Sequence, residues 1–394
     1  MSDREPIPQA FLDRCGALLG ERLQLGEATR LQHGSSETHF AAAPPDAVLF
    51  PATTEEVVAI VRLCDELDVP IIAFGAGTSL EGHVTPVRGG VSLDMSQMSR
   101  ILAVNTEDFD CTVEAGVRRE QLNEHLRDMG LFFPIDPGAN ATIGGMAATR
   151  ASGTNAVRYG TMREAILALR VVTPHGRDIR TARRARKSAA GYDLTRLMIG
   201  SEGTLGIITE VTLRLHGIPE TVSSAVCSFE TLEGAVTTVV ESIQLGVPLA
   251  RVEILDDAQM RAVNAWSKLD YPELTTLFFE FHGSPAGVAE QVETVKGLAS
   301  ANGGGEFRWS NLPEERSRLW KARPEETEEV EAINVRLVHR ALAMDGTCTG
   351  EHGIGLGKQQ WLVEELGEAV DSMRAIKRAL DPKDLFNPGK IFAL

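Results

Sequence analysis

Phe74-Gly-Ala-Gly-Thr-Ser-Leu-Glu-Gly-His83 is the stretch from which the rest of this 394-residue chain is best interpreted. The apolar, β-branched run at residues 69–73 precedes it and predicts a short buried strand. Three glycines, with a threonine and a serine between them, let a loop turn sharply, direct backbone N–H groups at one point and add hydroxyl donors. The loop therefore suits a phosphate or pyrophosphate, and a purely structural turn is the alternative.

Two common nucleotide-binding fingerprints do not match this loop. Its third glycine is residue 82 rather than 80, so the loop departs from the G-x-G-x-x-G pattern of dinucleotide-binding folds. No Gly-Lys-Ser/Thr sequence follows, which excludes a Walker A loop. The choice between a phosphate site and a turn therefore depends on the rest of the chain.

Length and composition indicate an ordinary globular protein with two domains. The length exceeds that of one ordinary core, and the chain is 43% hydrophobic and 24% charged. A net charge of −16 argues against general nucleic-acid binding and against an anionic membrane surface. The first residues are polar and no apolar run is long enough to span a bilayer, so we expect no signal peptide and no transmembrane segment.

The cysteines predict a reduced compartment. There are five, an odd number, and none forms a C-x-x-C pair. This usage is typical of buried thiols in a cytosolic protein rather than of a disulfide frame or a zinc ribbon. We expect a cytoplasmic protein, with peripheral attachment to the inner membrane as the alternative. Cys348 is the one cysteine close to a candidate site.

Short strands and helices alternate through the first half, around two further glycine-rich stretches. Gly144-Gly145 predicts a glycine turn that feeds a short helix, with N–H groups available to an anion. Ser201-Glu-Gly-Thr-Leu-Gly206 forms another glycine-rich turn before a strand at 207–215. This alternation of short strands and helices predicts mixed α+β layers rather than a doubly wound parallel sheet. The basic run at 177–187 favours a solvated loop, with docking of an acidic partner as the alternative.

The sequence pattern changes near residues 217–219, after which glycine-rich turns become fewer. Strand patterns and helix patterns then alternate, which predicts a second α+β domain. The expected strands and helices, in chain order, are 221–229, 232–245, 251–254, 256–265, 275–281 and 285–301.

Seven motifs in order carry a family resemblance over nearly the whole chain. They are Phe74–His83, Asp136–Gly138 with Ala141–Gly145, Arg158–Gly160, Arg186–Arg196, Gly200–Ile208, Gly350–Gly353 and Phe386–Lys390. The chain resembles the flavoprotein family of vanillyl-alcohol oxidase and para-cresol methylhydroxylase. The closer likeness is to the branch of D-lactate dehydrogenase, the glycolate oxidase subunit and D-2-hydroxyglutarate dehydrogenase.

The resemblance implies an α+β fold, in which a two-lobed FAD-binding domain of the para-cresol methylhydroxylase (PCMH) type precedes an α+β, ferredoxin-like cap. The expected domains are an N-terminal helical segment at 1–40, the FAD-binding domain at 41–218, the cap at 219–375 and a tail at 376–394 that returns to the FAD domain. The cap is expected to be truncated internally near 323–330.

The resemblance also implies which residues contact FAD, although each glycine among them also fits a plain turn. The pyrophosphate would be held by Gly75, Ala76, Gly77, Thr78, Ser79 and Gly82. The flavin would be lined by Pro137, Gly138, Ala141, Thr142, Gly144, Gly145, Ser152 and Gly153. The other end of the cofactor and the tail would contribute Glu202, Gly206, Ile208 and Asn387. His83 does not match a residue of covalent attachment, so we expect non-covalent FAD.

The reaction implied by the resemblance is oxidation of a 2-hydroxy acid. Such a reaction needs a base near neutral pKa, a cation for the carboxylate and a group that polarises the hydroxyl. His352 is the candidate base, and Glu351 is the match to a ligand of the family's zinc or manganese ion. Arg323 matches the carboxylate-binding arginine. A solvated loop histidine and a surface arginine are the alternatives for His352 and Arg323.

One family segment is absent. The pattern His-x-Gly-Asp-Gly-Asn-x-His, whose histidines complete the metal site, does not occur between Arg323 and Glu351. An internal deletion explains this, and Glu351 alone cannot hold a catalytic metal, because such sites use about three protein ligands. We therefore expect no bound metal. Glu280, His282 and His339 are of residue types that could replace the missing metal ligands, but nothing in their spacing supports that role.

Three hypotheses about function result. The first is an FAD-dependent dehydrogenase of D-2-hydroxy acids, with D-lactate as the default substrate and a cytochrome, quinone or electron-transfer flavoprotein as acceptor. The second is an FAD-binding pseudoenzyme or partner subunit without turnover. The third keeps the fold but performs non-redox chemistry on the flavin. A homodimer is compatible with each of them, and nucleic acid is not an expected partner.

Overall fold

The computed structural model describes residues 6–267, 270–310 and 329–394. The chain forms two compact units. One consists of Met1–Gly153, Thr161–His216 and Asn334–Leu394, and the other of Thr154–Gly160 and Gly217–Ile333. Residues 334–394 therefore group with the first unit, whereas the sequence led us to place 219–375 in one domain; the domain boundaries stay a prediction.

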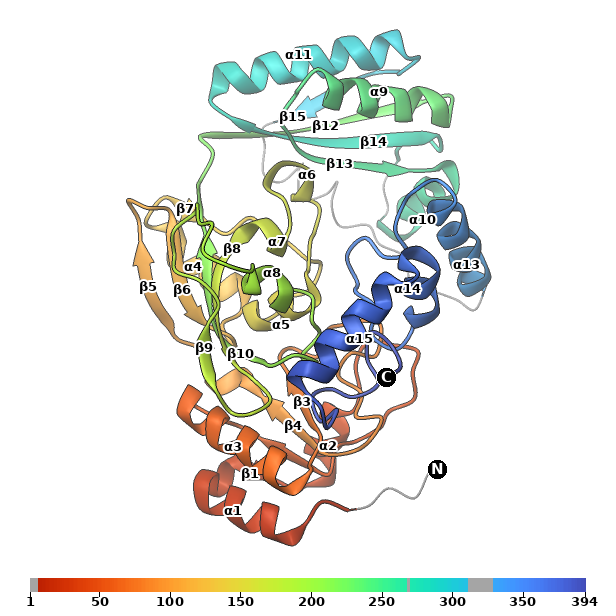
Figure 1. The fold of residues 1–394 in the computed structure, drawn as a ribbon. Coiled ribbons are helices and arrows are strands. Elements are labelled where there is room, and N and C mark those ends of the chain that lie inside the picture. The colour runs from red at the N-terminus through yellow and green to blue at the C-terminus, as the bar shows by residue number, and fades with distance from the viewer. Residues whose placement is uncertain (1–5, 268–269, 311–328) are drawn as a thin grey trace. The chain divides into compact units, whose positions relative to one another are not determined.

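A four-stranded sheet with parallel pairs forms one layer of the first unit (Figure 1). Its strand order is β1 (Leu23–Gln24), β2 (Ala47–Leu49), β4 (Val91–Asp94) and β3 (Ile71–Phe74), and β4 runs parallel to both β2 and β3. The helices of this layer are α1 (Gln9–Leu19), α2 (Glu27–His33) and α3 (Thr54–Leu67), with 3-10 turns at Gly20–Arg22 and Met95–Gln97. Thr53 caps helix α3, because its side chain accepts a hydrogen bond from the backbone N–H of Glu56.

A five-stranded antiparallel sheet forms the second layer of this unit. Its strand order is β5 (Ile101–Asn105), β6 (Asp110–Glu114), β10 (Ile207–Arg214), β8 (Ile166–Val172) and β9 (Asp178–Arg180). Helices α4 (Arg119–Arg127), α5 (Ile143–Thr149), α7 (Met162–Ala165) and α8 (Leu194–Met198) accompany it. The short strands β7 (Leu131–Phe132) and β11 (His216–Gly217) also form. Parallel and antiparallel sheets in one unit confirm the expected α+β class.

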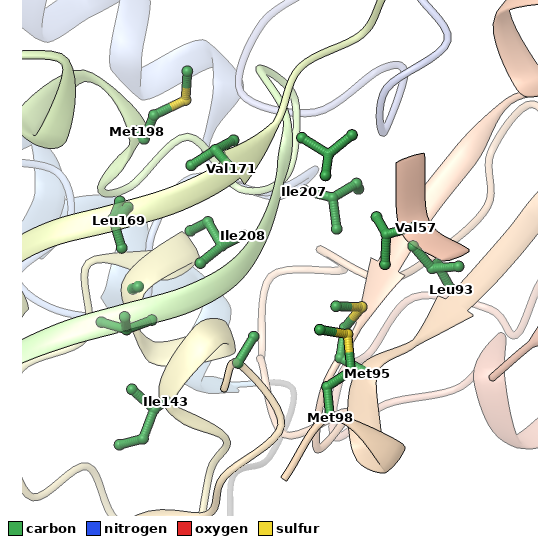
Figure 2. Packing of buried hydrophobic residues seen from close by; sticks show 14 of the residues in the cluster. Val57, Leu93, Met95, Met98, Ile143, Leu169, Val171, Met198, Ile207 and Ile208 are labelled. Carbon is green, nitrogen blue, oxygen red and sulfur yellow. The ribbon is translucent and has the colours of Figure 1, made fainter. Parts of the chain in front are cut away.

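One hydrophobic core joins these two layers. Val57, Leu93 and Met98 come from the first layer, and Leu169 and Ile207 come from the strands of the second (Figure 2). All five side chains are at most 2% exposed. Because the layers share a core, the loop that follows β3 is fixed relative to helix α5 and strand β10.

The C-terminal segment of the first unit consists of α14 (Gln359–Leu366), α15 (Ala369–Leu380) and a turn-rich tail. The tail lies against β3, where Leu385 accepts a hydrogen bond from Ile71 and Asn387 donates one back to Ile71. Lys377 of α15 is buried and donates to the carbonyls of Thr204 and Phe386. The sequence analysis predicted neither α14 nor α15.

The second unit is an antiparallel sheet with helices, as the alternation of patterns predicted (Figure 1). Its strand order is β13 (Leu249–Leu255), β14 (Thr275–Gly283), β12 (Thr221–Phe229) and β15 (Arg308–Ser310). Its helices are α6 (Ala156–Tyr159), α9 (Leu232–Gln244), α10 (Asp257–Ser267) and α11 (Pro285–Ala301), and α13 (Glu329–Leu342) begins where this unit ends. Phe279 and Phe281 are fully buried in its core.

One local expectation needs correction. Gly144 and Gly145 do not form a turn before a helix: Thr142 caps α5, so both glycines lie within its first turn. The reason is close packing, since a Cβ on Gly144 would lie 2.6 Å from the Cβ of Ala115.

The basic run at 177–187 begins at strand β9, and its residues 183–187 form an exposed loop as expected. Arg184 is about half exposed, yet it pairs with both Asp108 and Asp110 at 2.6 and 2.7 Å. Arg180 reaches Glu210 at 3.3 Å. Acidic residues of the same unit therefore hold this segment: Asp108 and Asp110 lie just before and at the start of β6, and Glu210 lies on the central strand β10.

Candidate functional site

The glycine loop at residues 75–83 leaves strand β3 and passes close to other backbone. A Cβ on Gly75 would lie 2.2 Å from the Oγ1 of Thr142, the cap of α5. Gly77 and Gly82 have φ angles of 72° and 71°, in the left-handed region that favours glycine. The loop is therefore pressed against the start of α5 and lacks side chains at the positions of contact.

Several buried polar atoms in and beside this loop make no hydrogen bond to the part of the protein that the structure describes, although the Nε2 of His83 lies 3.3 Å from Glu202. Within the described residues, the Oγ of Ser79 and the Oδ1 of Asn387 make no hydrogen bond, and neither do the ring nitrogens of His83. A buried polar atom without a partner costs about 1–3 kcal/mol. Together with the glycine cradle, the unsatisfied Ser79 hydroxyl fits a ligand that carries phosphate oxygens, as the pyrophosphate of FAD does.

The second glycine-rich stretch folds back on itself. Gly153 lies against Asp136, since a Cβ on Gly153 would lie 2.5 Å from the carbonyl of that residue. The predicted flavin-lining residues Pro137 and Gly138 therefore lie beside Ser152 and Gly153, although 14 positions separate the two pairs. Ala141 leads into the α5 cap and accepts a hydrogen bond from Arg119. The structure brings these residues together, and their contact with flavin stays a prediction.

Glu202 is bonded to protein groups through both carboxylate oxygens. Its side chain is 2% exposed, and its two carboxylate oxygens accept hydrogen bonds from the backbone N–H groups of Ile354 and Gly355 at 2.8 and 2.9 Å. The amide nitrogen of Asn387 donates to the carbonyls of His83 and Glu202 at 2.9 and 2.7 Å. The two predicted cofactor residues Glu202 and Asn387 thus connect chain segments.

The other two predicted residues of this stretch are packed. A Cβ on Gly206 would lie 2.7 Å from a methyl carbon of Val171, so only glycine fits where β10 meets β8. Ile208 lies in β10 and is 8% exposed. Whether either also contacts a cofactor stays a prediction.

The Glu351–His352 segment lies next to one of the predicted flavin-lining residues. The Oγ of Ser152 donates to Glu351 at 3.2 Å, and the Nε2 of His352 lies 3.5 Å from the other carboxylate oxygen. Both side chains are nearly half exposed, so a small substrate could reach them. The structure thus brings Ser152, Glu351 and His352 together. Arg323 lies outside the described residues.

The described residues do not fit a catalytic metal. In the parts of the chain that the structure describes, no group of three His, Cys, Asp or Glu side chains is placed to hold an ion. The substitutes have protein partners: His282 lies 2.7 Å from Glu280, and His339 lies 3.0 Å from Glu364. No catalytic step is therefore assigned to a metal.

A cavity of about 350 Å³, which the sequence did not predict, lies beside the same segment in the first unit. Charged residues of both signs line it together with serine, threonine and apolar residues; the charged ones are Arg150, Arg196, Glu202, Glu351 and Glu365. Cys348 also lines it, but burial raises the pKa of its thiol to about 12. At neutral pH the thiol is therefore protonated and does not act as a nucleophile.

Lys390 is a buried cation that the sequence analysis did not single out. Its Nζ donates to the carbonyl of Thr85, two residues beyond His83, at 2.7 Å. Burial lowers its pKa to about 8, and the charge of Glu202 opposes that shift. The Gly-Lys pair of the tail was the available signal, but nothing local shows that a lysine will be buried.

Residues 45–182 match the family model described as FAD binding domain, and residues 218–328 and 323–391 match the one described as FAD linked oxidases, C-terminal domain. A protein from Danio rerio named probable D-lactate dehydrogenase, mitochondrial, is 45% identical, with 95% of this chain and 90% of that protein covered. The chain belongs to the FAD-linked oxidases. This confirms the family resemblance and makes the protein an FAD-dependent oxidoreductase.

Other comparisons agree with this assignment. The D-lactate dehydrogenase [cytochrome], mitochondrial, of Arabidopsis thaliana is 41% identical, over 98% of this chain and 80% of that protein. An alkyldihydroxyacetonephosphate synthase structure has a TM-score of 0.74 at 20% identity and covers 98% of this chain and 86% of its own. A p-cresol methylhydroxylase structure has a TM-score of 0.70 at 15% identity and covers 98% of each. The structures establish the fold alone.

The comparisons also correct one expectation. We expected a cytoplasmic protein, but the relatives from Danio rerio and Arabidopsis thaliana are both named mitochondrial. The cysteine usage from which we argued indicates only a reducing compartment, and mitochondrial proteins can have the same usage. In the part of the chain that the structure describes, no helix is long and apolar enough to cross a membrane.

Proposed function

We propose that this FAD-linked oxidase oxidises a D-2-hydroxy acid to the 2-oxo acid, with D-lactate as the first substrate to test. The observation that carries the proposal is the identity of 45% and 41%, over nearly the whole chain, with two proteins named D-lactate dehydrogenase. The unsatisfied Ser79 hydroxyl and the glycine cradle beside it support a bound dinucleotide.

The residues assigned to the cofactor follow the three glycine-rich stretches. Gly75 to Ser79 and Gly82 would hold the pyrophosphate, and the segments around Gly138 and Ser152 would line the flavin. The absence of a matching attachment residue supports non-covalent FAD. Glu202 and Asn387 support the cofactor indirectly, because their polar atoms bond to the segments that border the loop.

The chain's own groups account for substrate binding and proton transfer. FAD, when bound, supplies the acceptor for the hydride from the substrate α-carbon. His352 would take the hydroxyl proton, and the carboxylate of Glu351, 3.5 Å from its Nε2, would stabilise the imidazolium that forms. By resemblance, Arg323 would bind the substrate carboxylate.

The electron acceptor is proposed at the level of its class. The Arabidopsis thaliana relative is named for a cytochrome, and this name supports a protein acceptor here as well. A quinone and an electron-transfer flavoprotein are the alternatives. A homodimer remains compatible with all three acceptors.

We also infer that the cap lacks a segment found in relatives. The alignment with the Danio rerio protein runs over 445 positions but uses 95% of 394 residues, about 374, so about 70 positions face gaps in this chain. The model of the C-terminal domain matches in two pieces that meet at 323–328. Both findings support a deletion near the expected position, 323–330.

The test is the visible spectrum of the purified protein before and after D-lactate is added without air. A flavin spectrum that bleaches with D-lactate and not with L-lactate supports the proposal. A flavin spectrum unchanged by D-lactate and by other D-2-hydroxy acids would instead support a cofactor-binding protein without this activity. Absence of flavin, even after reconstitution, would refute both. The cofactor content is checked by release of the bound flavin.

A further inference from the structure

Four separate segments of the first unit meet at Glu202, three of them at its buried carboxylate and the tail at its backbone carbonyl. They are the end of the cofactor loop at His83, the turn that carries Glu202 itself, the segment after His352 and the tail at Asn387. His83 and Glu202 are 4% and 5% exposed. The meeting point is therefore inside the protein and is not a surface cluster.

The carboxylate fixes the backbone directly after the candidate base. Its oxygens accept from the N–H groups of Ile354 and Gly355, two and three residues beyond His352. Hydrogen bonds from backbone N–H groups to a buried carboxylate are about twice as strong as neutral ones. Glu202 therefore sets where the segment after His352 lies, although it does not touch His352 itself.

The same carboxylate also faces the end of the cofactor loop. The Nε2 of His83 lies 3.3 Å from Glu202, and a Cβ on Gly353 would lie 2.8 Å from both of these atoms. Gly353 has a φ of 78°, which favours glycine as well. The amide of Asn387 closes the arrangement, because it donates to the carbonyls of both His83 and Glu202. A shift of the cofactor loop would therefore also disturb the segment after His352.

We propose that Glu202 is a positioning residue that couples the seating of the cofactor loop to the placement of His352. With the loop at 75–83 seated on FAD, His83 packs against Glu202, and the carboxylate holds residues 353–355. The role given to His352 rests on the proposed function, but the mechanical coupling does not. Coupling of this kind is reciprocal, so holding residues 353–355 also favours the seated loop.

Hydrogen exchange tests the coupling without any turnover. In the wild-type protein, the fragment containing residues 350–356 is expected to exchange at least about tenfold more slowly with FAD than without it. In the Glu202→Gln variant, one of the two amide hydrogen bonds is lost, and FAD should no longer slow this exchange. His83→Leu should give the same result, because the contact between the two loops is removed.

Glu210→Gln is the matched control. Glu210 is a buried carboxylate on β10, in the same unit, and it pairs with Arg170 and Arg180 rather than with the His352 segment. This variant should retain the effect of FAD on residues 350–356. Thermal melting of each variant shows that it is folded before exchange is measured, and His83→Leu serves if Glu202→Gln does not fold.

The kinetic readout separates positioning from cofactor contact. Glu202→Gln should lower kcat for D-lactate by about tenfold or more even when the variant is saturated with FAD, with KM little changed, because a misplaced base slows the chemistry. An equal exchange rate with and without FAD in the wild type would overturn the proposal. So would a Glu202→Gln variant that loses FAD but keeps its kcat when saturated with it. Failure of the wild type to oxidise D-lactate would refute the proposed function, and the exchange experiment would still decide the coupling.

Discussion

Close packing between Gly75 and Thr142 leads to a prediction about FAD affinity that can be worked out in detail. Gly75→Ala places a Cβ 2.2 Å from the Thr142 hydroxyl, although the next contact with Thr142, its Cβ, is an ordinary 3.4 Å. Gly75 has no positive φ, so the alanine backbone is not itself strained. The hydroxyl must rotate away and give up its bond to the N–H of Gly145, or the loop must shift.

The size of the effect follows from these two responses. Loss of the cap costs about 1 kcal/mol, and an overlap in a packed site costs about 1–3 kcal/mol. Since about 1.4 kcal/mol is a factor of ten, Gly75→Ala should weaken FAD binding by about 10–100-fold. Thr142→Ala alone should cost only the cap. The double variant should bind FAD about as well as Thr142→Ala does, because the overlapping oxygen is gone.

Titration of the apoprotein with FAD measures the four affinities of this double-mutant cycle. Gly297→Ala is the control, since a Cβ at that position on helix α11 meets no neighbour within 4 Å. If the double variant binds FAD with the summed losses of the single variants, steric coupling through the Thr142 hydroxyl is refuted. If Gly75→Ala binds FAD like the wild type, the loop is not held in the geometry described.

Three further predictions follow from other contacts. His352→Asn should reduce kcat for D-lactate by about 100-fold or more in steady-state assays. His339 is also a half-exposed histidine beside a glutamate, and His339→Asn should leave kcat unchanged. Equal losses in the two variants would exclude His352 as the base. Lys377→Met leaves the buried Asp381 carboxylate without its cation. Urea titrations should therefore show a free energy of unfolding that is lower by about 3–5 kcal/mol. A loss below about 1 kcal/mol would show that the pair contributes little to stability. Burial lowers the pKa of Lys390 from 10.5 to about 8, so the unfolded chain binds more protons than the folded chain between these pH values. Relative to Lys390→Met, the free energy of unfolding should therefore rise with pH over this window by an amount on the order of 3 kcal/mol. An identical pH dependence of the two proteins would contradict the buried position of the ammonium group.

Local patterns predicted much of the fold. Thr53 and the glutamates after it are a local signal for the start of α3, and the aromatic residues within 275–281 favour strand β14, because both signals depend on nearby residues only. Gly144 and Gly145 were misinterpreted for the opposite reason. Their requirement for glycine comes from Ala115, which lies far away in sequence, and nothing local distinguishes close packing from a turn.

The candidate site was predicted as a set of segments rather than as a geometry. The sequence placed Ser152 among the flavin-lining residues and Glu351 with His352 in a motif 199 positions later, and only the folded chain shows that Ser152 is their neighbour. The carboxylate of Glu202 could be recognised as important but not as bonded to residues 354 and 355. Arg323 and the expected deletion stay predictions, since they fall on residues that the structure does not describe.

The tail that pairs with β3 affects the order in which the protein can assemble. Ile71 exchanges backbone hydrogen bonds with Leu385 and Asn387, so more than 300 residues must be synthesised before that side of β3 is covered. Until then the strand that leads into the cofactor loop has an open edge, which favours pairing with other chains. Contacts between such distant residues also slow folding. The nascent chain therefore depends on its last segment to close the cofactor lobe, and truncation of that segment should cause aggregation rather than a merely weaker enzyme.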